Sequence, residues 1–135
     1  MSTHPLVAAF HARIWNAGDE QVDDLLTQDF RFRGSLGTEA HGPAEFLEYV
    51  RFVRGSLANY HCEILDCVTE LSRAFARMLF SGIHVASFRG VPPAGKFVQW
   101  HGAALFTFRE HTIAELWVLG DLTGLDAVLR MNAGA

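Results

Sequence analysis

Residues 60–121 contain four strand-length segments joined by short connections, and this arrangement limits the fold more than any other feature. The segments run over residues 60–69, 73–88, 96–109 and 113–121. A tight turn is expected at residues 110–112 and a longer loop at residues 89–95. Strands joined so closely pair antiparallel, because parallel pairs need long crossover connections. The pattern therefore predicts an antiparallel meander of long strands.

The start of the chain has helical spacing instead. The apolar residues that recur at this spacing after Pro5 are Leu6, Val7, Phe10 and Ile14. Gly18 is expected to end this helix, and Asp19 to cap a short second helix over residues 22–26. The first elements are therefore helical.

A further helix is expected to start at Pro43 and to end near Gly55. Before it, Phe and Arg alternate over residues 28–33, which is typical of a short strand, and a glycine-rich loop follows over residues 34–42. Helices that precede a meander indicate the α+β class. Long antiparallel strands curl, so that the sheet half-encloses a space where helices cover one face.

Composition and charge exclude several classes of protein. The chain has 135 residues, the length of one domain, and its 50% hydrophobic content excludes disorder. The net charge is −4 and Lys96 is the only lysine, so no nucleic-acid partner is expected. No apolar run approaches the roughly 18–20 residues of a membrane span, so no membrane partner is expected either.

The cysteines and the first residues bear on location. Cys62 and Cys67 lie five apart, which on a regular strand places them on opposite faces and makes them poor disulfide partners. The first ten residues lack the basic start and cleavage site of a signal peptide. A reducing, cytoplasmic location is therefore expected.

Two familiar kinds of site are not expected. Residues 90–96 match most of a phosphate-binding loop, but Phe97 stands where Ser or Thr is required and two prolines remove backbone donors. These residues are interpreted as a rigid hairpin loop. The seven histidines are scattered without a metal-binding spacing, so no metal site is expected.

The end of the last strand carries the most informative acidic residue. Trp117 and Asp121 are four residues apart and share one face of a strand. If that face lines the enclosed space, burial would raise the pKa of the Asp121 carboxyl towards neutrality, as proton transfer requires. Alternatively, Asp121 caps a terminal helix that begins after it. The residues alone leave both interpretations open.

Several separated motifs resemble those of the SnoaL-like polyketide cyclases, in the nuclear-transport-factor-2-like superfamily. They occupy residues 15–19, 41–43, 82–85, 90–96 and 117–125. The resemblance covers nearly the whole chain and implies a single SnoaL-like domain over residues 1–135. It implies a curved antiparallel sheet with N-terminal helices forming a conical pocket, a cystatin-like α+β barrel.

The resemblance also implies an activity. SnoaL-like cyclases close a ring of a polyketide ester by intramolecular aldol addition, without metal or cofactor. The acid/base aspartate of the family matches Asp121, and an aromatic residue that lines its pocket matches Trp15. His84 lies in a Gly-x-His motif similar to the family's, and it is either a polar assistant or a structural histidine.

The chain departs from the cyclase pattern at three positions. Phe32, Gly102 and Ala104 stand where the family has Asn, Gln and His. Such donors stabilise an enolate and contribute several kcal/mol each. The fold and the acid/base candidate therefore carry over, whereas the specific aldol machinery does not.

Alternation along residues 96–109 assigns the two faces of that strand. If Gly102 and Ala104 face inward, so does Trp100, while His101 faces outward unless a bulge reverses it. The expected ligand-binding residues are Trp15, Phe32, Trp100, Gly102, Ala104 and Trp117. The outward face mixes Phe97 and Leu105 with polar residues, which predicts a homodimer through the outer face of the sheet.

Two hypotheses for function remain. In the first, a hydrophobic, carbonyl-bearing small molecule binds in an aromatic-lined pocket, and Asp121, assisted by His84, moves a proton in a cofactor-independent cyclisation or isomerisation. In the second, the chain is a non-catalytic ligand-binding or assembly module of the same fold. The content of 11 Phe, 3 Trp and 2 Tyr favours an apolar ligand under both hypotheses.

Overall fold

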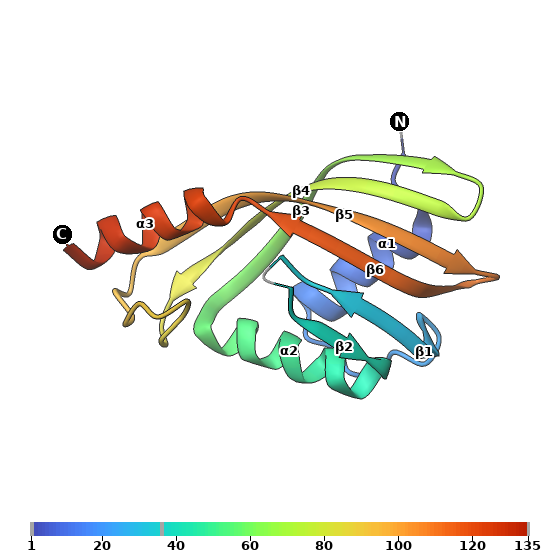
Figure 1. The fold of residues 1–135 in the computed structure, drawn as a ribbon, viewed down its shortest axis with the longest axis horizontal. Coiled ribbons are helices and arrows are strands. Elements are labelled where there is room, and N and C mark those ends of the chain that lie inside the picture. The colour runs from blue at the N-terminus through green and yellow to red at the C-terminus, as the bar shows by residue number, and fades with distance from the viewer. Residues whose placement is uncertain (1, 36, 135) are drawn as a thin grey trace.

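A curved, unclosed six-stranded sheet organises the molecule (Figure 1). The structure is a computed structural model that describes residues 2–35 and 37–134. The strands are β1 (Leu26–Arg33), β2 (Glu39–His41), β3 (Leu57–Glu70), β4 (Arg73–His84), β5 (Phe97–Arg109) and β6 (Thr112–Gly120). Their order is β2-β1-β6-β5-β4-β3. The expected meander is β3 to β6, and the fold is α+β as predicted.

One strand pair departs from the antiparallel expectation. β1 lies parallel to β6, while the other neighbouring strands pair antiparallel. The parallel pair arises because β1 comes from the N-terminal part of the chain and joins the open side of β6. β2, which falls in the segment expected to be loop, extends the sheet beyond β1.

The first helix is confirmed, but more than half of it is a π-helix. α1 (Pro5–Ala9) continues directly into η1 (Phe10–Asn16). Gly18 ends it at a φ of 71°, with its N–H bonded to the carbonyl of Ile14. A π-helix bonds over five residues rather than four, and such turns recur at functional sites.

The expected second helix is wrong. Val22 begins a single turn, in which its carbonyl accepts from the N–H groups of Leu25 and Leu26. Leu26 already belongs to β1 and pairs with Ile113 of β6. The short segment between Gly18 and the strand therefore leaves no length for further helical turns.

α2 (Gly42–Ser56) covers the concave face of the sheet, with Pro43 in its first turn as expected. Its buried side chains include Phe46, which packs against Phe10 of η1 and Phe30 of β1. α3 (Leu122–Gly134) projects from the end of the sheet (Figure 1). No helix among residues 2–35 and 37–134 is long and apolar enough to cross a membrane.

The two faces of β5 are as predicted. Val98, Ala104 and Phe106 are buried, whereas Gln99 and His101 are exposed. The pairing of β4 with β5 runs without a register shift from Arg73 to Ile83. No bulge therefore turns His101 inward.

The two cysteines do not lie on opposite faces, which corrects the expectation from their spacing. The pairing of β3 with β4 shifts between Ile64 and Asp66, where β3 has one extra residue. This bulge reverses the inward and outward alternation of the side chains that follow it. Cys62 and Cys67 consequently both point inward, and both are buried and free.

Candidate functional site

A cavity lies between the concave face of the sheet, η1 and α2. The space open to the centres of water molecules within it is about 70 Å³. Its lining is mostly aromatic and aliphatic, from η1, α2 and every strand except β2. Polar side chains are few: His11, Ser35, Tyr49 and Tyr60. An apolar cavity with few polar groups is the usual form of a small-molecule site.

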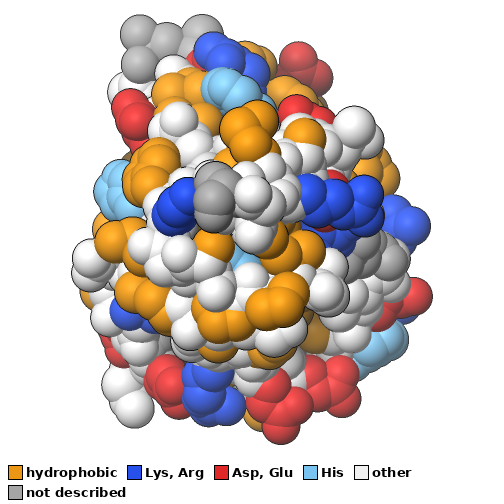
Figure 2. Space-filling view, turned by 90° about the vertical axis from the view of Figure 1, so that its left-hand side faces the viewer, with side chains coloured by type: hydrophobic (Ala, Val, Ile, Leu, Met, Phe, Trp, Pro, Cys, Tyr) orange, Lys and Arg blue, Asp and Glu red, His pale blue; other side chains and the backbone are white. Residues whose placement is uncertain are grey.

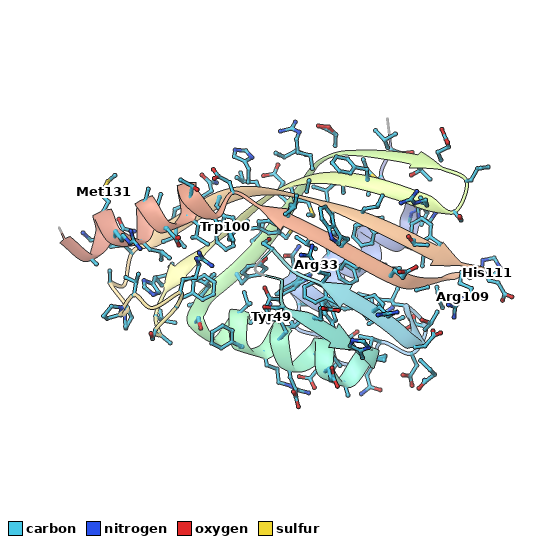
Figure 3. The ribbon with its side chains drawn as sticks, viewed as in Figure 1. Arg33, Tyr49, Trp100, Arg109, His111 and Met131 are labelled. Atoms are coloured by element: carbon cyan, nitrogen blue, oxygen red, sulfur yellow. The ribbon has the colours of Figure 1, made fainter. Side chains whose placement is uncertain are left out.

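The cavity opens at the end of the sheet that carries α3. Ser35, Trp100 and Val118 line it there and are partly exposed, whereas Phe106 and His11 line the other end and are buried. Figure 3 shows Tyr49, from α2, and Trp100, from β5, at this side of the space between helix and sheet. Figure 2 views the same end of the molecule, where hydrophobic side chains gather above a charged lower edge.

Gly120 holds the mouth open. A Cβ at Gly120 would stand 3.1 Å from Ser35 Oγ and 3.4 Å from Trp100 Nε1. Both of those side chains line the cavity, so a larger residue here would press into its entrance.

Four of the predicted ligand-binding residues come together around the cavity. They are Trp15, Phe32, Trp100 and Ala104. The Phe32 ring lies 5.2 Å from that of Tyr49, which in turn lies 6.1 Å from that of Trp15, so the wall is a continuous set of aromatic contacts. The structure therefore assembles these four residues at one place, while their role in binding stays a prediction.

Gly102 is not at the cavity. A side chain at this position would collide with the ring of Phe80, which fills the expected open space and lies 5.3 Å from the ring of Trp100. Phe80 itself lines the cavity. The room expected beside Gly102 is therefore occupied, whereas Ala104 does border the open space.

Trp117 faces the opposite way from the expectation. It lies on the outer face of the sheet with 41% of its surface exposed, and the guanidinium of Arg33 stands 5.8 Å from its ring. Leu116 and Val118 are the residues of β6 that line the cavity. The inward orientation of Trp117 was wrong because residues 116–119 are all apolar, so alternation does not mark an inner face.

Asp121 lies between β6 and α3, one residue beyond the mouth, and it is exposed. Its Oδ1 accepts a hydrogen bond of 2.9 Å from the N–H of Gly124, and its own N–H donates to the carbonyl of His101. Asp121 therefore caps the first turn of α3, as the capping interpretation predicted. Asp121 is not among the residues that line the cavity, and its acid/base role stays a prediction.

His84 is completely buried at the end of β4, opposite Leu57 of β3. Neither ring nitrogen has a hydrogen-bond partner among residues 2–35 and 37–134. His84 does not line the cavity, and the structure does not join it to Asp121 by a hydrogen bond. Its assisting role also stays a prediction.

The sequence interpretation missed the buried polar residue of the cavity, His11. Only 3% of its surface is exposed, and its Nδ1 lies 3.0 Å from the carbonyl oxygen of Val7. Burial lowers the pKa of His11 to about 4, against a smaller opposing effect of the Val7 hydrogen bond. The available signal was spacing, because His11 stands four residues from both Val7 and Trp15.

Two tyrosines were also missed. Burial raises the pKa of Tyr49 and, more strongly, that of Tyr60. Both phenols therefore keep their protons near neutral pH and can donate hydrogen bonds.

Two observations bear on the other kinds of site considered from the sequence. Within the described ranges, no three His, Cys, Asp or Glu side chains gather as a metal site would require. Residues 90–94 belong to the connection between β4 and β5, where a bridge joins Phe88 to Val91. This loop does not lead into a helix, unlike a phosphate-binding loop.

Comparison with protein-family models identifies one family. The family model for SnoaL-like polyketide cyclases matches residues 5–129. The search of curated proteins found no match to this chain.

Three solved structures illustrate the similarity. TsrD from Streptomyces laurentii is 26% identical, with a TM-score of 0.81 over 92% of this chain and 91% of its own. A candidate SnoaL-like polyketide cyclase from Jannaschia sp. CCS1 is 18% identical, with a TM-score of 0.83 over 96% of each chain. A Catenulispora acidiphila protein described as having a ketosteroid isomerase-like fold is 16% identical, with a TM-score of 0.79 over 98% of this chain and 95% of its own.

Proposed function

The chain belongs to the SnoaL-like polyketide cyclase family, and on that premise we propose that its cavity binds a hydrophobic, carbonyl-bearing small molecule. We propose further that the whole chain, 1–135, is one such domain and acts on this ligand as a cofactor-independent acid/base cyclase or isomerase. The observation that carries the proposal is the aromatic cavity with its few polar groups.

The chemistry of the mouth suits a carbonyl group. Trp100 offers an indole N–H, and Tyr49 offers a phenol that burial keeps protonated. Both can donate to a carbonyl oxygen, and both rings can cover an aromatic ligand. The cavity is small for a ligand site, so a ligand of one or two rings would occupy it in part and extend through the mouth, and a large polycyclic molecule would fit worse.

Asp121 is the acid/base group of this proposal. It follows Gly120 at the mouth, and its Oδ2 has no hydrogen-bond partner among the described residues, while Oδ1 caps α3. In the proposed step, Oδ2 takes a proton from the carbon next to the ligand's carbonyl, and the electron pair moves to the carbonyl oxygen. Donors at Trp100 and Tyr49 stabilise that oxygen, and the carboxylic acid returns the proton to complete the reaction.

Binding is tested with acetylnaphthalene, an uncharged aromatic ketone of two rings. We expect saturable quenching of tryptophan fluorescence, because Trp15 and Trp100 line the cavity. Ala104→Leu fills the cavity and should abolish binding, whereas Ala103→Leu, on the outer face of the same strand, should not. Equal binding by the two variants would contradict the proposed site.

Proton transfer is tested with the same ketone in deuterium oxide. If Asp121 acts as proposed, the protein accelerates deuterium uptake at the methyl group beside the carbonyl, and Asp121→Asn loses the acceleration. Asn keeps the capping hydrogen bond, so the fold should survive. Exchange that is unchanged in Asp121→Asn would remove Asp121 from the chemistry.

The second candidate function is a non-catalytic ligand-binding module. It is favoured by the apolar residues Phe32, Gly102 and Ala104, which replace the polar groups of the cyclase pattern, and by the exposure of Asp121. It predicts that acetylnaphthalene binds without any accelerated exchange. The two candidates therefore separate in one pair of measurements.

We also propose a homodimer through the outer face of the sheet. The pairing register places Val68, Phe75, Leu105 and Trp117 in one row across β3, β4, β5 and β6. Val68 and Phe75 are each about half exposed, and Trp117 only slightly less so. A continuous apolar row of this kind is typical of a contact surface. The free thiols of Cys62 and Cys67 support a cytoplasmic location for this assembly.

A further inference from the structure

His11 stands at the closed end of the cavity, opposite the mouth. It comes from η1 and lies beside Phe106 of β5, with 5.8 Å between the ring centroids. Trp100 marks the mouth on the same strand, six residues before Phe106. The cavity therefore has polar groups at both ends and an apolar wall between them.

The hydrogen bond to Val7 determines which nitrogen of His11 carries the proton. A carbonyl oxygen can only accept, so at 3.0 Å the Nδ1 atom must donate to it. Since burial keeps the ring neutral at physiological pH, as its lowered pKa indicates, Nε2 carries a lone pair and no proton.

The Nε2 atom borders open space in the cavity. It has no hydrogen-bond partner among residues 2–35 and 37–134. Among those residues, the polar side-chain atoms that are fully buried and have no hydrogen-bond partner belong to Thr27 and His84. Nε2 of His11 is not one of them, so it is accessible from the cavity that His11 lines. A buried acceptor that faces a cavity without a partner loses hydrogen-bond energy unless a ligand or water supplies a donor.

Resting on the proposed function, we propose that Nε2 of His11 accepts a hydrogen bond from a hydroxyl group of the ligand. The cavity then selects an uncharged aromatic or enolic molecule with a hydroxyl group at one end and a carbonyl group at the other. A carboxylate at the closed end would meet the His11 lone pair in apolar surroundings, which disfavours it strongly. The donors at Trp100 and Tyr49 take the carbonyl oxygen at the mouth.

The test compares two probes that differ in one group, because the hydroxyl hydrogen of the first is replaced by a methyl group in the second. One is acetylnaphthalene with a hydroxyl group on the ring far from the acetyl group, and the other carries a methoxy group there. We expect wild-type protein to bind the hydroxy probe roughly three- to tenfold more tightly, the range of one net hydrogen bond. His11→Phe should erase this preference, and His11→Gln, which keeps an acceptor, should retain part of it.

A matched control and a direct readout complete the test. His111→Phe, in the exposed β5–β6 turn at the far end of the molecule, should keep the wild-type preference (Figure 3). In a long-range proton–nitrogen NMR correlation, the Nε2 resonance of His11 should shift with the hydroxy probe and not with the methoxy probe.

The outcomes separate this inference from the proposed function. If wild-type protein binds both probes equally, or if His11→Phe keeps the preference, the role of His11 is wrong while ligand binding stands. If wild-type protein binds neither probe, the proposed function itself fails and the inference falls with it. Circular dichroism of each variant confirms that the fold is intact.

Discussion

The carboxylate of Asp121 and the backbone of Gly124 are joined by a hydrogen bond of 2.9 Å, which caps the first turn of α3. The same carboxylate is the acid/base candidate of the cavity mouth. A side chain at residue 124 would collide with Asp121 Oδ2, so the glycine leaves room for the carboxylate. Asp121 thus has a structural role as a helix cap, and a variant that tests its chemistry must keep the capping hydrogen bond.

Replacing Asp121 should separate the two roles. Asp121→Ala removes the cap and should lower the free energy of unfolding by about 1 kcal/mol, whereas Asp121→Asn should change it by only a few tenths. Urea denaturation measures both. Equal destabilisation by Asn and Ala would show that the negative charge, rather than the capping hydrogen bond, stabilises α3.

Gly102→Ala should destabilise the protein by about 1–3 kcal/mol, because the new methyl group meets the Phe80 ring and the carbonyl of Leu119. Gly55→Ala is the matched control. It adds a methyl group to α2 where nothing lies within 4 Å, and should be neutral or stabilising by up to about 1 kcal/mol. Thermal and urea unfolding of both variants check the prediction, which a neutral Gly102→Ala would contradict.

The buried His11 should make stability depend on pH. Its pKa falls from 6.5 in the unfolded chain to about 4 in the fold, so the unfolded state binds more protons between these values. The free energy of unfolding should therefore have its full value above about pH 6.5. It should decrease by up to roughly 3 kcal/mol as the pH falls towards 4, because the unfolded chain then gains a proton at His11 that the folded protein does not bind.

The control for that pH dependence is His11→Phe, which should remove most of the decrease between pH 6.5 and 4.5. Carboxyls such as Asp19 and Asp24, whose pKa values are lowered by hydrogen bonds to Gln21 N–H and to Arg13 respectively, lose their contribution at lower pH in both proteins. Parallel curves for the two proteins over that interval would show that His11 is not the titrating group.

The apolar row on the outer face predicts the assembly state. At micromolar concentration, sedimentation should give a dimer, and Leu105→Arg, at the centre of the row, should give a monomer. Glu70→Arg, at the end of β3 beyond the row, should remain dimeric. A monomeric wild-type protein would contradict the proposed interface.

The long elements were predictable because their patterns are local. Helical spacing after Pro5, the glycine stop at Gly18 and the alternation along β5 each placed an element correctly. The family motifs then identified the sheet and the cavity, and Trp15, Phe32, Trp100 and Ala104 were placed at it.

The errors arose where tertiary structure overrides local pattern. Residues 116–119 are apolar on both faces, so the orientation of Trp117 depends on a surface that the pattern does not reveal. The bulge in β3 inserts one residue between Cys62 and Cys67, and this turns Cys67 to the inner face. Phe80 fills the space beside Gly102 from a neighbouring strand, which spacing within β5 cannot indicate.

The most direct test of the central claim, that an aromatic ketone binds between sheet and helices, uses the methyl groups of two adjacent alanines. Ala104 lines the cavity, and Ala103 lies on the outer face. On titration with acetylnaphthalene, the account predicts intermolecular NMR contacts between the probe and the Ala104 methyl group, and none to that of Ala103. Contacts to Ala103 alone, or to neither methyl group, would contradict it.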